Sequence, residues 1–223
     1  LLLLIELASR DAGLPPGVVN VVTGTGTEVG TPLVQHPLVR KVSFTGSVRA
    51  AQEIGHIAAD RILPLGLELG GKSPHLVFAD ADRARALDGV IAGLVTNAGQ
   101  LCSAGSRCLV DRSILRPFVK DLRQRIDALT IGPAADDTIG PVITPAQHAK
   151  VRSHYEAAAL EHGDRFYRAP LADGLRDRFI PPAFVVLDDR NAGILKEEVF
   201  GPLLAILPFD SESEAIDLAN DSD

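Results

Sequence analysis

The feature that most constrains the fold is the alternation of short apolar runs with helical patterns. The strand-like runs are residues 18–22, 41–46, 63–71, 74–80 and 107–111, and helical patterns lie between them. Strands that alternate with helices are typical of parallel sheets covered by helices on both faces. We therefore predict an α/β fold with a Rossmann-like unit first and a second α/β parallel-sheet unit after it.

The double glycine Gly70-Gly71 separates two such α/β stretches, and we place the domain boundary there. The predicted domains are residues 1–70 and 71–223. In the second domain we predict helices over residues 113–129 and 145–162, a strand within "FIPPAFVVLDD", and a loop at 196–202 that leads into a strand. A helix begins near "SESEAIDLAND".

The chain opens with "LLLLIEL", which resembles the apolar part of a secretory signal. Glu6, Arg10 and Asp11 follow at once, and the apolar run is far shorter than the ~20 residues that span a bilayer. We predict a buried helix over residues 2–12 that ends before Gly13, and no membrane partner.

Composition excludes some function classes. The net charge of −7 argues against a nucleic-acid-binding surface, which needs a basic patch. Two cysteines without a secretory signal fit a reducing compartment such as the cytoplasm. Cys102 and Cys108 match neither a redox nor a zinc spacing, and the histidines form no metal motif. We expect no metal site.

Two glycine-containing stretches could lie against phosphate groups. "GTGTEVG" (24–30) stands between a strand-like run and a helical pattern, and "FTGS" (44–47) repeats this arrangement. Glycines let the backbone approach a phosphate, and a helix N-terminus favours an anion. A plain strand–turn–helix joint explains the first stretch equally well, and a simple N-cap role explains Ser47.

Cys102 and Glu68 are the candidate reactive side chains. Cys102 lies in "GQLCSAGSR", where small neighbours leave room for a substrate and main-chain N–H groups could stabilise an oxyanion. Glu68 lies in the apolar run "LGLELGG", which suits a general base. The alternatives are inert packing for the thiol and solvent exposure at a strand edge for the carboxylate. For Cys108, inert packing is the expected role.

The stretch "KEEVFGP" (196–202) offers a carboxylate for ribose hydroxyls and an aromatic ring for a flat ligand. These are Glu198 and Phe200. A charged loop that enters a strand is the alternative.

Taken together and in this order, the motifs resemble the aldehyde dehydrogenase superfamily. The matching stretches are "PPGVVNVV", "VSFTGS", "LELGGKSP", "GQLCSAGSR" and "KEEVFGPLLAIL". The resemblance implies that residues 1–70 are the C-terminal part of an NAD(P)-binding domain and that residues 71–223 are an incomplete catalytic domain. It implies an NAD- or NADP-dependent oxidation of an aldehyde to a carboxylic acid.

By resemblance, Cys102 is the nucleophile that forms a thiohemiacetal and then a thioester, and Glu68 is the base for hydrolysis. The implied cofactor contacts are Gly26, Thr27, Gly46, Ser47, Leu69, Gln147, Glu198 and Phe200. The presence of Glu68 favours release of a free acid over transfer to coenzyme A.

The chain also departs from the family pattern. Ala51 stands where the family usually has glycine, and the oxyanion-hole asparagine of the family has no counterpart here. We expect a central fragment of a longer chain that is nearly inactive alone, from a parent that is a homodimer or homotetramer. The substrate and the choice between NAD and NADP stay open. A non-catalytic scaffold on the same fold is the alternative function.

Overall fold

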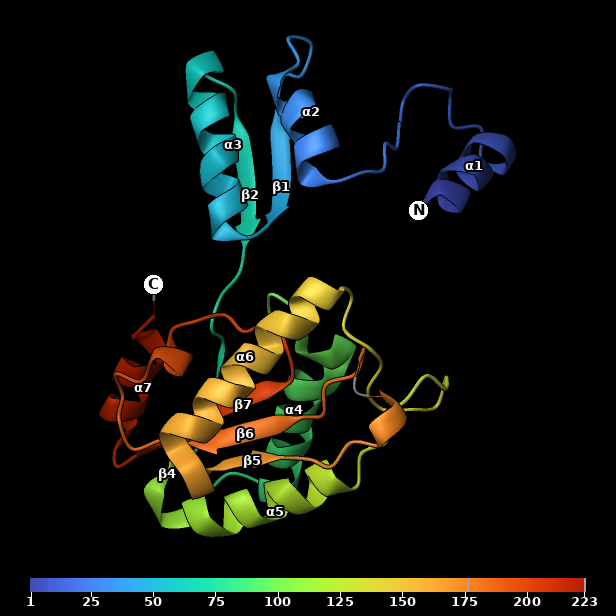
Figure 1. Ribbon diagram of the computed structural model, residues 1–223. Helices are drawn as coiled ribbons and strands as arrows, with labels where there is room; N and C mark the ends of the chain where they lie inside the picture. The colour runs from blue at the N-terminus through green and yellow to red at the C-terminus, as the bar shows by residue number, and fades with distance from the viewer. Residues whose placement is uncertain (176, 223) are drawn as a thin grey trace. The chain divides into compact units, whose positions relative to one another are not determined.

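The computed structural model describes residues 1–175 and 177–222. The chain forms two compact units, Leu1–Leu69 and Gly70–Asp223, each with its own sheet (Figure 1). The division falls at the double glycine. The α/β fold class is confirmed, while the roles assigned to the two units stay predictions.

A β–α–β element forms the centre of the first unit. Strand β1 (Val42–Gly46) pairs in parallel with β2 (Leu65–Leu69), and helix α3 (Val48–Arg61) connects them. Ser47 is the N-cap of α3, because its Oγ accepts a hydrogen bond from the Ala50 amide at 3.3 Å. Gly46 ends β1 beside Leu69, the last residue of β2.

The segment before β1 corrects two predictions. Helix α1 (Leu2–Asp11) is present, but none of its residues is buried. Residues 18–22 form no strand, and four of the five are exposed. A strand needs a neighbour that satisfies its N–H and C=O groups, and the described residues give this run none. The apolar character of these two segments therefore led to two wrong predictions: burial of α1, and strand pairing of residues 18–22.

A π-helical turn and a short helix follow this segment. The turn covers Gly26–Gly30, and α2 (Thr31–Gln35) continues from it. The helical pattern expected after the stretch 24–30 is therefore present, with a wider first turn. Thr25 caps the turn by accepting a hydrogen bond from the Glu28 amide at 3.2 Å.

The second unit contains a five-stranded sheet in the order β3-β4-β7-β6-β5. All neighbouring strands are parallel except β5, which pairs antiparallel with β6. The strands are β3 (Pro74–Val77), β4 (Arg107–Asp111), β5 (Phe166–Arg168), β6 (Ala183–Val186) and β7 (Leu203–Phe209). All seven residues of β7, the central strand, are buried.

Helices flank this sheet (Figure 1). They are α4 (Arg83–Val95), α5 (Leu115–Asp127), α6 (Pro145–His162) and α7 (Glu212–Asn220). Strand residues alternate between two cores: Cys108 and Val110 pack in the cluster that contains α4, α5 and α6, and Leu109 packs in the cluster that contains α7. Because side chains of a strand alternate between faces, the two clusters lie on opposite faces of the sheet.

Side-chain caps fix where these helices begin. Asp82 Oδ1 accepts hydrogen bonds from the amides of Ala84 and Arg85, at 3.0 and 3.2 Å. Thr144 caps α6 just before Pro145, and Ser211 caps α7. Ser, Thr and Asp are preferred at this position because their oxygens satisfy free amides of the first turn. Helices α6 and α7 begin close to their predicted positions.

Candidate active site

The loop that carries Cys102 follows a sharp reversal of the backbone. After α4, three successive residues adopt positive φ: Asn97 (52°), Ala98 (53°) and Gly99 (71°). This conformation is costly for residues other than glycine and persists only where the surroundings enforce it. The reversal presents Cys102 at the surface, whereas Cys108 lies buried in β4.

Hydrogen bonds from Gln100 enforce this reversal. Its buried side chain donates to the Asn97 carbonyl at 2.9 Å and accepts from the Ile143 amide at 2.9 Å. Asn97 Nδ2 in turn donates to the Gln100 carbonyl at 3.0 Å. The side chain at position 100 therefore ties the Cys102 loop to the segment before α6.

Close backbone approaches hold the loop on two further sides. A Cβ at Gly99 would lie 2.5 Å from the Gly201 carbonyl carbon, so Gly99 packs directly on the chain after Phe200. A Cβ at Gly105 would overlap the His75 imidazole, and one at Gly93 would lie 2.7 Å from His75 Nε2. The imidazole of His75 thus lies in a slot between α4 and the Cys102 loop.

The structure places the "KEEVFGP" segment beside this loop through contacts from α6. Gln147 Nε2 donates to the carbonyls of Val199 and Phe200, at 3.1 and 2.7 Å. Lys150 Nζ donates to the Glu198 carbonyl at 2.8 Å. The Gln147 amide group therefore supports the main chain of the predicted cofactor loop. Lys150 was missed because its role depends on a contact 48 residues away.

The side chain of Glu198 lies over the main chain at Gly70. A Cβ at position 70 would overlap the Glu198 carboxylate in its present position. Oxygen Oε1 of Glu198 is buried and has no hydrogen-bond partner among the described residues. Phe200 has φ of 57°, a strained value for a bulky residue. An unpartnered buried oxygen and a strained aromatic residue both indicate a functional segment.

The two thiols differ in environment. Burial raises the pKa of the Cys108 thiol to about 12. It therefore stays protonated near neutral pH, and only a thiolate is a strong nucleophile. Cys102 is exposed and open to reagents. Inert packing is thus the better description of Cys108, as the sequence predicts.

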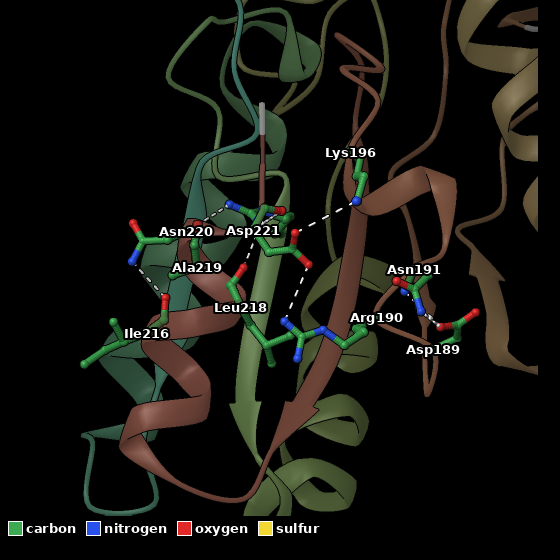
Figure 2. A network of polar contacts seen from close by, with 10 residues as sticks. Asp189, Arg190, Asn191, Lys196, Ile216, Leu218, Ala219, Asn220 and Asp221 are labelled. Carbon is green, nitrogen blue, oxygen red and sulfur yellow. Dashed lines mark hydrogen bonds and ion pairs between the residues drawn. The ribbon is translucent and has the colours of Figure 1, made fainter.

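One end of the Cys102 loop leads into Arg107, whose guanidinium is buried. Nε donates to the Lys72 carbonyl at 2.7 Å, while Nη1 and Nη2 donate to the carbonyls of Leu218 and Ala219, at 2.9 and 2.7 Å. Figure 2 shows this end of α7, where Asp221 lies between Arg190 and Lys196, at 3.6 and 3.9 Å. Arg107 therefore connects the start of β4 to the C-terminus of α7.

The first unit contains a cavity of about 580 Å³. Gly26 and Thr27 line it, together with Lys41 and Arg49. The structure thus brings the predicted glycine-rich turn together with the first turn of α3. The charged residues Lys41, Arg49 and Glu53 line the same cavity, so its two cations outnumber its one carboxylate. Neither lysine nor arginine was predicted here. Ala51 is buried in α3.

Four predicted residues lie at the carboxyl ends of β1 and β2. Gly46 and Ser47 follow β1, and Glu68 and Leu69 end β2. Glu68 is exposed in this structure. The carboxyl ends of parallel strands are where α/β folds bind ligands.

The second unit brings together Cys102, Gln147, Glu198 and Phe200, through Gly99, Gly201 and the α6 contacts. Of the residues that the structure describes, no three His, Cys, Asp or Glu side chains form a group able to hold a metal ion. In the same described ranges, no helix is long and apolar enough to cross a membrane.

The family model of the aldehyde dehydrogenase family matches residues 1–223 of this chain. Succinate-semialdehyde dehydrogenase [NADP(+)] of Escherichia coli is 42% identical, over 100% of this chain and 46% of its own length. A chloroplastic aminoaldehyde dehydrogenase of Arabidopsis thaliana is 39% identical, over 98% and 44%. The chain therefore spans about half the length of these relatives.

Solved structures agree with these matches. An NAD-dependent aldehyde dehydrogenase of Sinorhizobium meliloti superposes with a TM-score of 0.90 at 39% identity, covering 97% of this chain and 43% of that one. Betaine aldehyde dehydrogenase of Staphylococcus aureus in complex with NAD⁺ gives 0.89 at 38% identity, covering 98% and 44%.

Proposed function

Because this chain belongs to the aldehyde dehydrogenase family, we propose that the whole protein oxidises an aldehyde to a carboxylic acid with NAD or NADP. The observation that carries the proposal is the exposed thiol of Cys102, held on a strained and tightly fixed loop. That loop packs against the segment that contains Glu198 and Phe200. A thiol with only a packing role needs neither exposure nor a fixed loop.

In the proposed reaction, the Cys102 thiolate attacks the aldehyde carbonyl and forms a thiohemiacetal. When bound, NAD or NADP would accept the hydride that this adduct must lose to become a thioester. Glu68 takes a proton from a water molecule, which attacks the thioester carbonyl. The carboxylic acid leaves, and the sulfur of Cys102 is released as a thiolate or thiol.

The residues present fit a dinucleotide. Glu198 offers a buried oxygen that lacks a partner in the described part of the chain and could accept a hydrogen bond from a ribose hydroxyl. Phe200 would flank the nicotinamide, and Leu69 would approach it. Gly26, Thr27, Gly46 and Ser47 would hold the pyrophosphate and adenine side, where the cations Lys41 and Arg49 outnumber the one carboxylate, Glu53. Gln147 supports the loop from α6.

We also propose that the 223-residue chain by itself turns over slowly. These residues contain no counterpart of the asparagine that completes the oxyanion hole in the family. Losing one such donor costs roughly 10²–10³ in rate in a well-studied protease.

The test is steady-state turnover of the whole protein with a panel of aliphatic and aromatic aldehydes, with NAD and NADP in parallel. We expect activity that Cys102→Ala abolishes and Cys108→Ala leaves largely intact. Silence across the panel with both cofactors would favour a non-catalytic scaffold.

A further inference from the structure

Lys72 is a buried lysine whose charge has no local partner. It follows the double glycine and leads into β3, and only 6% of its surface is exposed. Its Nζ atom has no hydrogen-bond partner within residues 1–175 and 177–222. Lysine is almost never fully buried unless paired, since a buried ammonium loses its hydration. Among the described residues, no hydrogen bond therefore offsets the free-energy cost of burying the Lys72 ammonium.

The charges around Lys72 come from three elements. Arg107 lies at the start of β4, Glu197 and Glu198 lie in the loop before β7, and Lys150 and His154 lie on α6. Burial and the charges of Arg107 and Lys150 lower the pKa of Lys72, while Glu198 and Glu197 raise it. The net result is a pKa of about 8. His154 Nδ1 also lies 3.8 Å from Glu197 Oε2.

Among these charged groups, Glu198 also has a buried atom that lacks a hydrogen-bond partner. Its Oε1 is buried and unpartnered in the described structure, as is Lys72 Nζ. Its carboxylate lies against the main chain at Gly70, two residues before Lys72. Glu197, by contrast, is exposed and lies near His154. A buried cation near a buried anion lowers the cost of keeping both ionised.

We propose that Lys72 is a positioning residue for Glu198, whose ammonium keeps that carboxylate ionised and oriented toward the ribose hydroxyls of the cofactor. The inference rests on the proposed role of Glu198 in cofactor binding. The carboxylate of Glu198 then offsets part of the cost of burying the Lys72 ammonium. Lys72 itself touches neither cofactor nor substrate in this account.

The experiment measures the dissociation constant of NAD by calorimetric titration of the whole protein, without aldehyde. Lys72→Met removes the charge while keeping a long side chain that fits a buried site. We expect binding to weaken about tenfold, the size expected when a charged hydrogen-bonding group loses its support. Lys72→Arg keeps the charge and should recover most of this loss. Lys120→Met, which removes an exposed lysine of α5, is the matched control and should bind as the parent does.

A double-mutant cycle distinguishes a positioning role of Lys72 from a general disturbance of the local structure. In a Glu198→Gln background, Lys72→Met should cause no further loss of affinity, because no carboxylate remains to be positioned. Thermal unfolding gives a second readout in the Glu198→Gln background: there Lys72→Met should melt at or above the Glu198→Gln single variant, since the buried lysine that is removed has no carboxylate beside it.

The outcomes are distinguishable. If Glu198→Gln binds NAD as tightly as the parent, the proposed role of Glu198 fails, and this inference fails with it. If Glu198→Gln weakens binding but Lys72→Met does not, only the role of Lys72 is overturned. Equal losses from Lys72→Met in both backgrounds would also overturn it, since the lysine would then act by packing.

Discussion

At the scale of single residues, the two cysteines have opposite environments. Cys102 is exposed, and Cys108 is buried with a thiol pKa raised to about 12. We predict that iodoacetamide at pH 8 alkylates Cys102 and spares Cys108 in the folded chain, as read by peptide mass spectrometry. Guanidinium should make both react. Similar labelling of both thiols in the folded chain would contradict the assignment.

Gly105 is needed because the His75 imidazole occupies the place of its side chain. We predict that Gly105→Ala lowers the free energy of unfolding by about 1–3 kcal/mol, the usual cost of overpacking. Urea unfolding of the two proteins measures this change in the free energy of unfolding.

Gly89→Ala is the matched control, because a Cβ there meets nothing within 4 Å and the residue lies inside α4. Alanine at that helical position should gain roughly 0.5–1 kcal/mol. A Gly105→Ala variant as stable as the parent would show that His75 moves freely.

Lys72 also gives stability a defined pH dependence. Below pH 8 the lysine is protonated in both states, and burial penalises the folded one. From its folded pKa of about 8 to its unfolded value of 10.5, the unfolded state binds more protons. Stability contributed by this group therefore rises with pH across that window.

We predict that the stability of Lys72→Met relative to the parent is highest below pH 8 and falls toward pH 10.5. Chemical denaturation at several pH values measures this difference. A stability difference that does not change with pH would mean that the pKa of Lys72 is the same in the folded and unfolded states, so that burial does not shift it.

At the scale of secondary-structure elements, Arg107 fastens β4 to the end of α7. Its buried guanidinium donates to carbonyls of Lys72, Leu218 and Ala219. Lysine has one ammonium and cannot reproduce this planar set of donors. We predict that Arg107→Lys costs about 1–3 kcal/mol of stability, since buried carbonyls lose their partners.

Denaturant unfolding with Arg116→Lys as the control tests this prediction. Arg116 is an exposed residue of α5, so its replacement should change stability little. Equal stability of the two variants would show that the Arg107 contacts contribute nothing.

Sequence periodicity predicted most elements of the second unit, because each has a cap or an apolar pattern of its own. It was wrong at residues 18–22, since an apolar run does not reveal whether a pairing strand exists. It missed β5, which has only three residues and an exposed edge. Motifs indicated Cys102 and Glu198, but Lys72, His75 and Lys150 depend on contacts between distant segments. The signals available in the sequence were two charged residues next to buried strands, Lys72 and Arg107.

At the scale of the whole molecule, the two units differ in how much core they contain. In the first unit, the buried apolar residues are Val34, Ala51 and Ala58, whereas the second unit contains two extended core clusters. Resistance to local opening follows buried apolar contacts. We predict that hydrogen exchange of the 223-residue chain is slowest in β4 and β7 and faster throughout β1 and β2. Equal protection of the two sheets would contradict this division.

The central claim is that Cys102 forms the thioester and Glu68 hydrolyses it. The most direct measurement is rapid-mixing absorbance of NADH on the whole protein with excess aldehyde, comparing the parent, Cys102→Ala and Glu68→Gln. We predict turnover for the parent, no NADH for Cys102→Ala, and a single burst near one equivalent without turnover for Glu68→Gln. Undiminished steady turnover in either variant would contradict the proposed roles of Cys102 and Glu68.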